Sequence, residues 1–180
     1  LPMILAPVVV GLSWRTLLLT PRYGLIDFLS EAIGLGSRSW LGDPSWALTS
    51  VIVIHTWQWT PFAFLVFTAA IAALPTEPFE AARLDRASPW QTFVHITLPL
   101  LRPAIVIVVI FRSMIALRAF AAIFAATGGG PGSATEILNL YAYRTSFTSF
   151  SLGYGAALAT TLLLVTVAIS VVFFRVRQRA

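Results

Sequence analysis

The sequence contains no cysteine and no lysine, and it has few charged residues of either sign. Without cysteine the chain can form neither a disulfide framework nor a thiolate metal site. Without lysine it cannot complete a Gly-Lys-Ser/Thr phosphate-binding loop, so the glycine cluster Gly128–Gly130 is not a nucleotide site. Charged residues make up 11% of the chain, against about 25% in soluble domains. These absences exclude an ATPase core and argue against a water-soluble fold.

Apolar residues dominate instead, at 58% of the 180 residues, which is more than one soluble core of this size can bury. A helix needs about 20 residues to cross the hydrocarbon core of a membrane. Four apolar runs reach or approach that length: Pro2–Leu19, Trp46–Leu74, Pro103–Ala126 and Gly153–Phe174. The predicted fold class is all-α, a polytopic transmembrane helix bundle of four spans that forms a single domain over residues 1–180. Since Leu1 already lies inside an apolar run, we expect an N-terminally truncated chain rather than a signal peptide.

The arginines set the predicted orientation. Four spans place the 75–102 loop on the same side as the C-terminus, with the 20–45 and 127–152 loops on the opposite side. The first side holds Arg83, Arg86, Arg102, Arg175, Arg177 and Arg179, and the other holds Arg22, Arg38 and Arg144. Since positive residues mark the cytoplasmic side, we predict a bacterial-type inner-membrane protein with a cytoplasmic C-terminus. The arginines are too scattered to predict a nucleic-acid partner.

The predicted cytoplasmic segment 75–99 has the pattern of two short helices joined by a bend near Arg86–Ser88. Thr76 can cap the first helix, and Ser88 with Gln91 can form a capping box for the second. We expect Pro99 to end that second helix before the next span. The segment also offers an apolar face, unusual in a solvent-facing connector: Ala81, Ala82, Leu84, Trp90, Phe93 and Ile96. This face either docks on another protein or packs on the cytoplasmic ends of the chain's own helices.

The spacing within this segment resembles the EAA loop of ABC importer permeases. Glu80-Ala81-Ala82 is followed by three residues, one marked position, nine residues and Ile96-x-Leu98-Pro99. In that family the loop is a coupling helix that sits in a groove of the cytoplasmic ATPase. The resemblance implies an ATPase-coupling surface made of Glu80, Ala81, Ala82, Leu84, Asp85, Arg86, Ile96, Leu98 and Pro99. The family has glycine where Arg86 stands, and arginine in a left-handed conformation costs on the order of 1 kcal/mol.

The resemblance extends along the whole chain. Trp57–Phe62 is similar to the span that precedes the loop, and Thr127–Gly132 with Tyr141–Arg144 resembles the outer loop of carbohydrate importers of the maltose and glycerol-phosphate kind. Many relatives carry aspartate where Ala121 stands. Family members have six or more spans, so the chain resembles their last four. The outer loop is expected to contact a solute-binding protein through Gly128, Gly129, Gly130 and Pro131; the alternative is a merely flexible connector.

The family also implies the partners. These are a second permease subunit, two cytoplasmic ATPase subunits, an external solute-binding protein and membrane lipid. ATP hydrolysis is then expected on the ATPase subunits, so this chain is predicted to be neither an enzyme nor the holder of a cofactor or metal.

Polar groups within the predicted spans are candidates for a substrate route. Arg112 lies about 13 Å along a helix from Pro103, near the midplane, where a charge costs about 2.5–3.5 kcal/mol. On the second span a common face carries His55, either Gln58 or Trp59, and Phe62. We predict that His55, Gln58, Trp59, Phe62 and Arg112 line a route for a sugar or polyol. Alternatively, they satisfy one another or pair with further helices.

Two other functions stay open at this point, and so does another substrate class for a permease, such as an amino acid or a phosphonate, against which only the glycine-rich outer loop argues. A secondary transporter or channel would need acids within its spans for ion coupling, yet all seven Asp and Glu lie in the predicted loops. A membrane scaffold or non-functional remnant remains compatible with Arg86 and Ala121. The preferred prediction is a permease subunit of an ATP-driven importer, coupled to its ATPase through the 77–98 helices.

Overall fold

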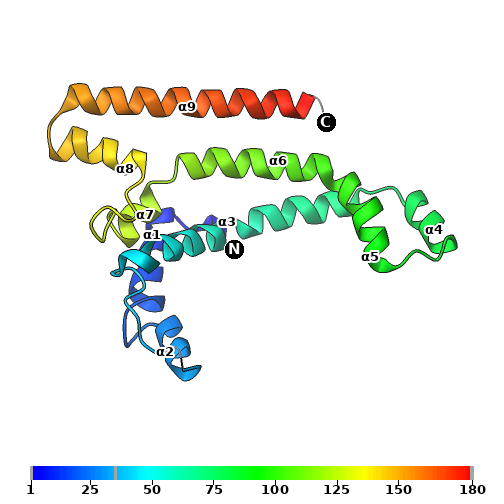
Figure 1. Cartoon of the computed structure of the whole chain (residues 1–180), viewed down its shortest axis with the longest axis horizontal. Coiled ribbons are helices and arrows are strands. Elements are labelled where there is room, and N and C mark those ends of the chain that lie inside the picture. The colour runs from blue at the N-terminus through cyan, green and yellow to red at the C-terminus, as the bar shows by residue number, and fades with distance from the viewer. Residues whose placement is uncertain (1, 35, 179–180) are drawn as a thin grey trace. The chain divides into compact units, whose positions relative to one another are not determined.

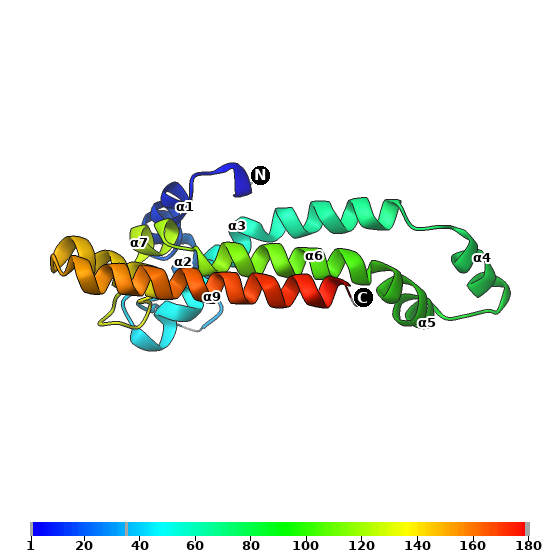
Figure 2. The same ribbon diagram turned by 90° about the horizontal axis from the view of Figure 1, so that it is seen from above.

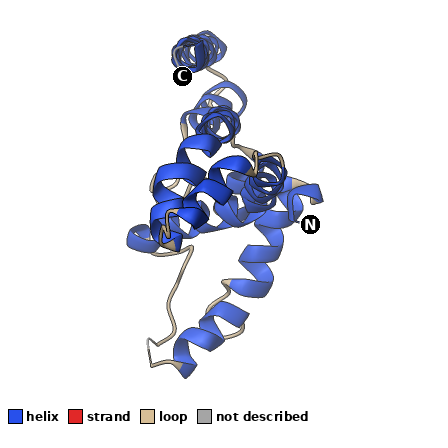
Figure 3. Cartoon of the chain, turned by 90° about the vertical axis from the view of Figure 1, so that its right-hand side faces the viewer, coloured by secondary structure: helices blue, strands red, loops and turns tan. Residues whose placement is uncertain are grey.

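The computed structural model describes residues 2–34 and 36–178, and every regular element in this part of the chain is a helix (Figures 1 and 3). The all-α prediction is therefore confirmed. Four elements are single turns: η1 is 3₁₀, and η2, η3 and η4 are π-helical. The elements follow one another as η1 (Pro2–Ile4), α1 (Pro7–Ser13), η2 (Trp14–Leu18), α2 (Leu25–Ala32), α3 (Pro44–Ala72), α4 (Glu77–Leu84), α5 (Pro89–Thr92), η3 (Phe93–Thr97), α6 (Leu98–Leu117), α7 (Ala121–Ala126), α8 (Leu138–Tyr143), η4 (Arg144–Thr148) and α9 (Leu152–Gln178).

Among the described residues, three helices are long and apolar enough to cross a membrane: Pro44–Ala72, Pro89–Leu117 and Leu152–Val171. The first predicted run is different. Pro7 occupies the first position of α1, and the continuous apolar helix covers only Pro7–Leu18, about 18 Å in length. That is shorter than the roughly 30 Å hydrocarbon core, so the structure supports three of the four predicted spans by length.

The third predicted span also has different bounds. Its helix begins upstream of Pro103, which lies inside α6, and it stops at Leu117 instead of running to Ala126. The break before α7 has a partner elsewhere in the chain. Asn139 Nδ2 donates to Leu117 O at 2.9 Å and to Ala119 O at 3.3 Å. The amide thus satisfies carbonyls that the end of a helix leaves without an intrahelical donor.

Pro99 does not end the second helix of the 75–99 segment. The turn Phe93–Thr97 is π-helical, and Leu98 N donates to Phe93 O, five residues back. This wider turn leads directly into α6, so the apolar helix runs without interruption from Pro89 to Leu117. Proline has no N–H to donate, and π turns are a recognised way of accommodating such a position.

Local capping accounts for where α3 begins. Asp43 Oδ1 accepts hydrogen bonds from Ser45 N at 2.9 Å and from Ser45 Oγ at 2.7 Å, and Pro44 is the first helical residue. An acceptor at the N-cap satisfies a backbone donor of the first turn, and proline there has no donor to leave unsatisfied. The helix start predicted from Asp43-Pro44 is confirmed. The Ser45 hydroxyl and amide also hold the pKa of the Asp43 carboxyl below its usual value.

The chain forms two compact units, the first comprising Leu1–Pro61 with Leu117–Val167 and the second Phe62–Ala116 with Ala168–Ala180. The prediction of a single domain over 1–180 stays a prediction. In the first unit α1 packs on α7, with a core of Val10, Trp14, Leu19, Ile54 and Ala126. A Cβ on Gly11 would lie 2.4 Å from Ala122 O, so this approach of two helices requires glycine at position 11.

In the second unit α4 and α5 lie side by side at one end of the unit (Figures 1 and 2). Phe62 of α3 and Phe111 of α6 pack with their ring centroids 6.1 Å apart. The orientation predicted from the arginines stays a prediction, and Arg179, one of the residues on which it rests, lies outside the described residues.

Candidate functional site

The bend between α4 and α5 is a Schellman turn with Arg86 at the left-handed position. Arg86 has φ +54°. Its N–H donates to Arg83 O at 3.1 Å, and Ala87 N donates to Ala82 O at 2.9 Å. These two bonds satisfy carbonyls at the end of α4, and glycine is the usual residue at this position because it has no Cβ. The left-handed conformation considered for Arg86 from the sequence is therefore present.

The second helix of the bend begins with the predicted capping box. Gln91 N donates to Ser88 Oγ at 3.3 Å, and Ser88 N donates to Gln91 Oε1 at 2.8 Å. The reciprocal bonds fix the direction in which α5 leaves the bend. The corresponding prediction for α4 is wrong. Thr76 precedes that helix, but its hydroxyl makes no capping hydrogen bond and its backbone is already helical.

The tip of the bend presents bulky apolar side chains without cover. Leu84 is 85% exposed and Trp90 is 72% exposed. The Trp90 and Phe93 rings stack with centroids 5.8 Å apart, so the indole is held in place although it is exposed. We call Leu84, Trp90 and Phe93 the apolar tip. Packing on the chain's own helices, the alternative considered from the sequence, accounts for Ala82 but not for these three.

The other predicted coupling residues divide between the surface and the interior of the bend. Ala82 is buried and Ile96 is half-buried, both lining a groove of about 460 Å³ between α4 and the following helix. The remaining members are exposed, with Leu98 and Pro99 already inside α6: Glu80, Ala81, Asp85, Arg86, Leu98 and Pro99. The predicted coupling residues therefore lie together in one contiguous segment of the structure.

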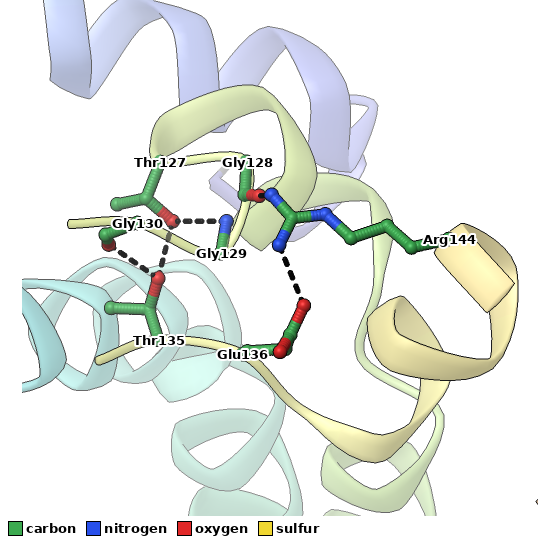
Figure 4. A network of polar contacts seen from close by, with 7 residues as sticks. All are labelled: Thr127, Gly128, Gly129, Gly130, Thr135, Glu136 and Arg144. Carbon is green, nitrogen blue, oxygen red and sulfur yellow. Dashed lines mark hydrogen bonds and ion pairs between the residues drawn. The ribbon is translucent and has the colours of Figure 1, made fainter. Parts of the chain in front are cut away.

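An ion pair holds the glycine-rich loop Thr127–Gly132. The loop therefore has fixed contacts that its glycine content alone does not indicate. Arg144 Nη1 contacts Glu136 Oε1 at 2.6 Å, and Arg144 Nη2 donates to the carbonyl of Gly128. Figure 4 shows the guanidinium lying between the two acceptors. A planar guanidinium can bond two groups at once, so Arg144 fixes the loop to the start of η4.

Two threonines close the same loop from the other side. The Thr127 and Thr135 hydroxyls lie 2.7 Å apart, and Thr135 Oγ1 also donates to Gly130 O at 2.8 Å (Figure 4). Gly129 has φ +94°, and a Cβ there would lie 2.7 Å from Leu140 Cδ2. Of the predicted contact residues, Gly129 is buried, whereas Gly128, Gly130 and Pro131 are half-buried.

The five residues predicted for a substrate route are divided between the two units. His55, Gln58 and Trp59 belong to the first, and Phe62 and Arg112 to the second. Gln58 is 1% exposed, and its Nε2 donates to Leu5 O at 3.2 Å. His55, Trp59, Phe62 and Arg112 are half-buried. Phe62 packs on Phe111. The assignment of these five to a route stays a prediction.

Sequence reasoning missed a buried carboxylate in the 20–43 segment. Asp27 is fully buried and accepts hydrogen bonds from Ser37 Oγ at 2.5 Å, Arg38 N at 2.9 Å, Arg22 N at 2.6 Å and Trp40 Nε1 at 2.9 Å. The bond from Ser37, followed by that from Arg38 N, lowers the Asp27 pKa to about 2. Its sequence context gave one clue, an acid inside an otherwise apolar helical stretch, Leu25–Leu29.

Comparison with known proteins points to one family. A family model described as "Binding-protein-dependent transport system inner membrane component" matches residues 1–179. A probable ABC transporter permease protein of Bacillus subtilis, YurN, is 37% identical over 172 residues, which cover 94% of this chain and 59% of that protein. The trehalose/maltose transport system permease protein MalF of Thermococcus litoralis is 32% identical over 170 residues, covering 94% of this chain and 57% of that protein.

A solved structure shares the fold. The crystal structure of a bacterial alginate ABC transporter, in complex with a periplasmic protein bound to alginate pentasaccharide, superposes with a TM-score of 0.85 at 24% identity. The match covers 99% of this chain and 62% of that one. At this identity the likeness concerns the fold alone. This chain spans a little over half the length of the curated relatives given above.

Proposed function

Because this chain belongs to the family of inner membrane components of binding-protein-dependent transport systems, we propose that it forms part of the pore of an ATP-driven importer for a sugar or related polyol. ATP is hydrolysed on two separate ATPase subunits, and a second permease subunit completes the pore. A solute-binding protein delivers the substrate from outside. The relative named for trehalose and maltose transport supports the substrate class.

The observation that carries the proposal is the apolar tip. Leu84 and Trp90 are among the more exposed large apolar side chains of the described residues, and they project from a bend whose two ends are fixed by a Schellman turn and a capping box. Exposed apolar groups on a rigid support are typical of a protein interface. A groove in an ATPase subunit is the occupant that we propose for this tip.

Coupling then follows from continuity of the helix. The segment from Pro89 to Leu117 is a single apolar helix. Movement of Trp90 is passed to a candidate membrane span, because both belong to one continuous helix. Closure of the ATPase pair would thereby tilt α6 and switch the pore from facing inward to facing outward.

Association with the ATPase tests the proposal directly. We expect Leu84→Ser and Trp90→Ser to abolish co-purification of the ATPase subunit with the permease. Tyr23→Ser is the matched control, since Tyr23 is 88% exposed but lies outside the bend, and it should leave association intact. Retention of the ATPase by the double variant Leu84→Ser/Trp90→Ser would contradict the proposal, as would transport that proceeds without any ATPase.

We propose that the α4–α5 bend and the C-terminus lie in the cytoplasm and that the Gly128–Pro131 loop lies outside. The absence of cysteine from these residues makes this measurable, because a single introduced cysteine is then the only thiol in this part of the protein. Ser133→Cys should react with a membrane-impermeant maleimide in intact cells, whereas Glu80→Cys should react only after permeabilisation. The reverse pattern would place the bend outside and remove it from any ATPase.

For the substrate route we propose His55, Trp59, Phe62 and Arg112, which combine hydrogen-bonding groups with aromatic faces. Gln58 belongs to the same predicted set, but here its amide is bonded to Leu5 O. Replacing Arg112 with leucine should raise the half-saturating concentration for transport at least about tenfold if the guanidinium contacts the sugar. Unchanged transport in Arg112→Leu would exclude it from the route.

A further inference from the structure

The first unit contains a pocket of about 320 Å³ between the end of η2, the 39–42 segment and the glycine-rich loop. We call it the loop pocket; its lining includes Arg15, Ser39, Leu41, Thr127, Gly130 and Pro131. The pocket is lined by Arg15 of η2, by Ala126 at the end of α7 and by segments that join helices. None of the three membrane-span candidates lines it among the described residues.

Both walls of the loop pocket are held by buried or half-buried charged groups. Asp27 accepts hydrogen bonds from Arg38 N and Trp40 Nε1, on either side of Ser39. On the opposite wall, Thr135 Oγ1 donates to Gly130 O, and Arg144 Nη2 donates to the carbonyl of Gly128. A site whose walls are already fixed loses less entropy on binding than a mobile loop.

The chemistry of the lining indicates an anionic ligand. Arg15 is the one charged side chain among the described residues that line the pocket. It has no carboxylate within ion-pair distance in the part of the chain that the structure describes. Three of the other acids are occupied, since Asp27 is fully bonded, Asp43 caps α3 and Glu136 pairs with Arg144. Glu31 is exposed and forms no ion pair with Arg15. The pocket therefore offers a cation with no internal counterion.

The remaining lining distinguishes between sources of the anion. No aromatic ring is present among the described lining residues, although sugar rings usually bind on aromatic faces. Leu19, Leu41 and Ala126 provide an apolar collar, while Ser39 and Thr127 provide hydroxyls. The side chain of glutamate or aspartate matches both the apolar collar and the polar groups of this lining, because it has an aliphatic portion that ends in a carboxylate. A lipid headgroup fits less well, because none of the three membrane-span candidates contributes to the walls among the described residues.

We propose that the loop pocket is the socket for an acidic side chain of the external solute-binding protein, with Arg15 as its ion-pair partner. The inference rests on the proposed function and adds the place and the chemistry of docking. Gly130 and Pro131 then act as walls of the socket. Thr135 and Arg144 are positioning residues that hold those walls.

The test uses the assembled transporter, with its second permease and ATPase subunits, in nanodiscs. The probe is a sugar-loaded solute-binding protein that stimulates ATP hydrolysis by the wild-type transporter. Arg15→Gln should raise the concentration of binding protein that half-maximally stimulates ATP hydrolysis about tenfold, and should flatten its dependence on ionic strength. Ser39→Phe, which keeps the charge but fills the pocket, should have a similar effect. Arg22→Gln, which removes an exposed charge outside the pocket, should change the value by less than about twofold.

The outcomes separate this inference from the function on which it rests. Basal ATP hydrolysis shows whether the transporter has assembled. If Arg15→Gln lowers basal hydrolysis, the result for Ser39→Phe decides whether the socket exists. Wild-type stimulation in either Arg15→Gln or Ser39→Phe overturns the socket, and an equal loss in Arg22→Gln shows a diffuse charge effect and also overturns it. So does an Arg15 effect that disappears in nanodiscs of purely zwitterionic lipid, since the anion is then a lipid headgroup. A wild-type complex that no binding protein stimulates refutes the proposed function itself.

Discussion

The side-chain amide of Gln58 donates a hydrogen bond to the main-chain carbonyl of Leu5, 3.2 Å away. Leu5 lies in the short non-helical stretch between η1 and α1, where its carbonyl has no intrahelical partner. Gln58 is almost fully buried in α3. A buried side-chain amide without a partner is costly, so this bond satisfies Gln58 and ties the N-terminal segment to α3.

We expect Gln58→Leu to lower the free energy of unfolding by about 0.5–1.5 kcal/mol, because the hydrogen bond to Leu5 O is lost. Unfolding of the detergent-solubilised chain, followed by tryptophan fluorescence, measures the effect. Thr56→Val is a control on an exposed position of the same helix. If Gln58 instead contacts substrate, Gln58→Leu will leave unfolding unchanged and raise the half-saturating sugar concentration.

Arg86→Gly should stabilise the α4–α5 bend by about 0.5–1 kcal/mol, because glycine adopts the φ of +54° without a Cβ clash. Unfolding in detergent measures the gain, and ATP hydrolysis stimulated by the binding protein reports whether coupling improves. Arg83→Gly is the matched control. It removes the same charge from the last turn of α4 but should destabilise the helix by about 1 kcal/mol. A loss of stability in Arg86→Gly would show that the arginine side chain has an essential contact.

Features set by neighbouring residues were predictable from the sequence. The long apolar helices follow from runs of hydrophobic residues, and the caps at Asp43 and Ser88 follow from residues two or three positions apart. The EAA-type spacing likewise located the α4–α5 bend, with its left-handed residue at Arg86. In each case the determining contacts are local.

Features that depend on distant partners were not predictable. The third predicted span ends early where Asn139 donates to Leu117 O and Ala119 O, which lie 22 and 20 positions before it in the sequence. The same holds for Asp27 with Trp40 and for Arg144 with Gly128. A glycine cluster indicates flexibility when read alone, and only its tertiary partners show that the loop is held.

The glycine-rich loop provides a matched pair of substitutions. Gly129→Ala should destabilise the first unit by about 2–4 kcal/mol, since it adds left-handed strain and overpacks Leu140. Gly132→Ala introduces only the strain, because nothing lies within 4 Å of its Cβ position, and should cost about 1 kcal/mol. Unfolding of both variants under the same conditions measures the difference. Equal losses would show that Leu140 yields to the added methyl and that the packing at Gly129 is loose.

Acid should open the 20–43 segment through Asp27. Its pKa is lowered to about 2 in the folded chain by the bonds from Ser37 and Arg38 N, from a usual value of 3.8. The unfolded chain therefore binds more protons than the folded chain between these values. Asp27 contributes stability that is fully present above about pH 4 and is lost as the pH falls through 2.

Trp40 reports this change because its indole N–H donates to Asp27. Its fluorescence should shift as the pH falls from about 4 to 2, with the hydrogen exchange of the Arg22 and Arg38 amides rising in parallel. Asp27→Asn removes the titrating group and should flatten both responses, at the cost of a less stable segment at neutral pH. Asp43→Asn, which affects the cap of α3 instead, is the control and should leave the Trp40 response in place. A wild-type response that persists in Asp27→Asn would assign the acid transition to another group and leave Asp27 without a titrating role.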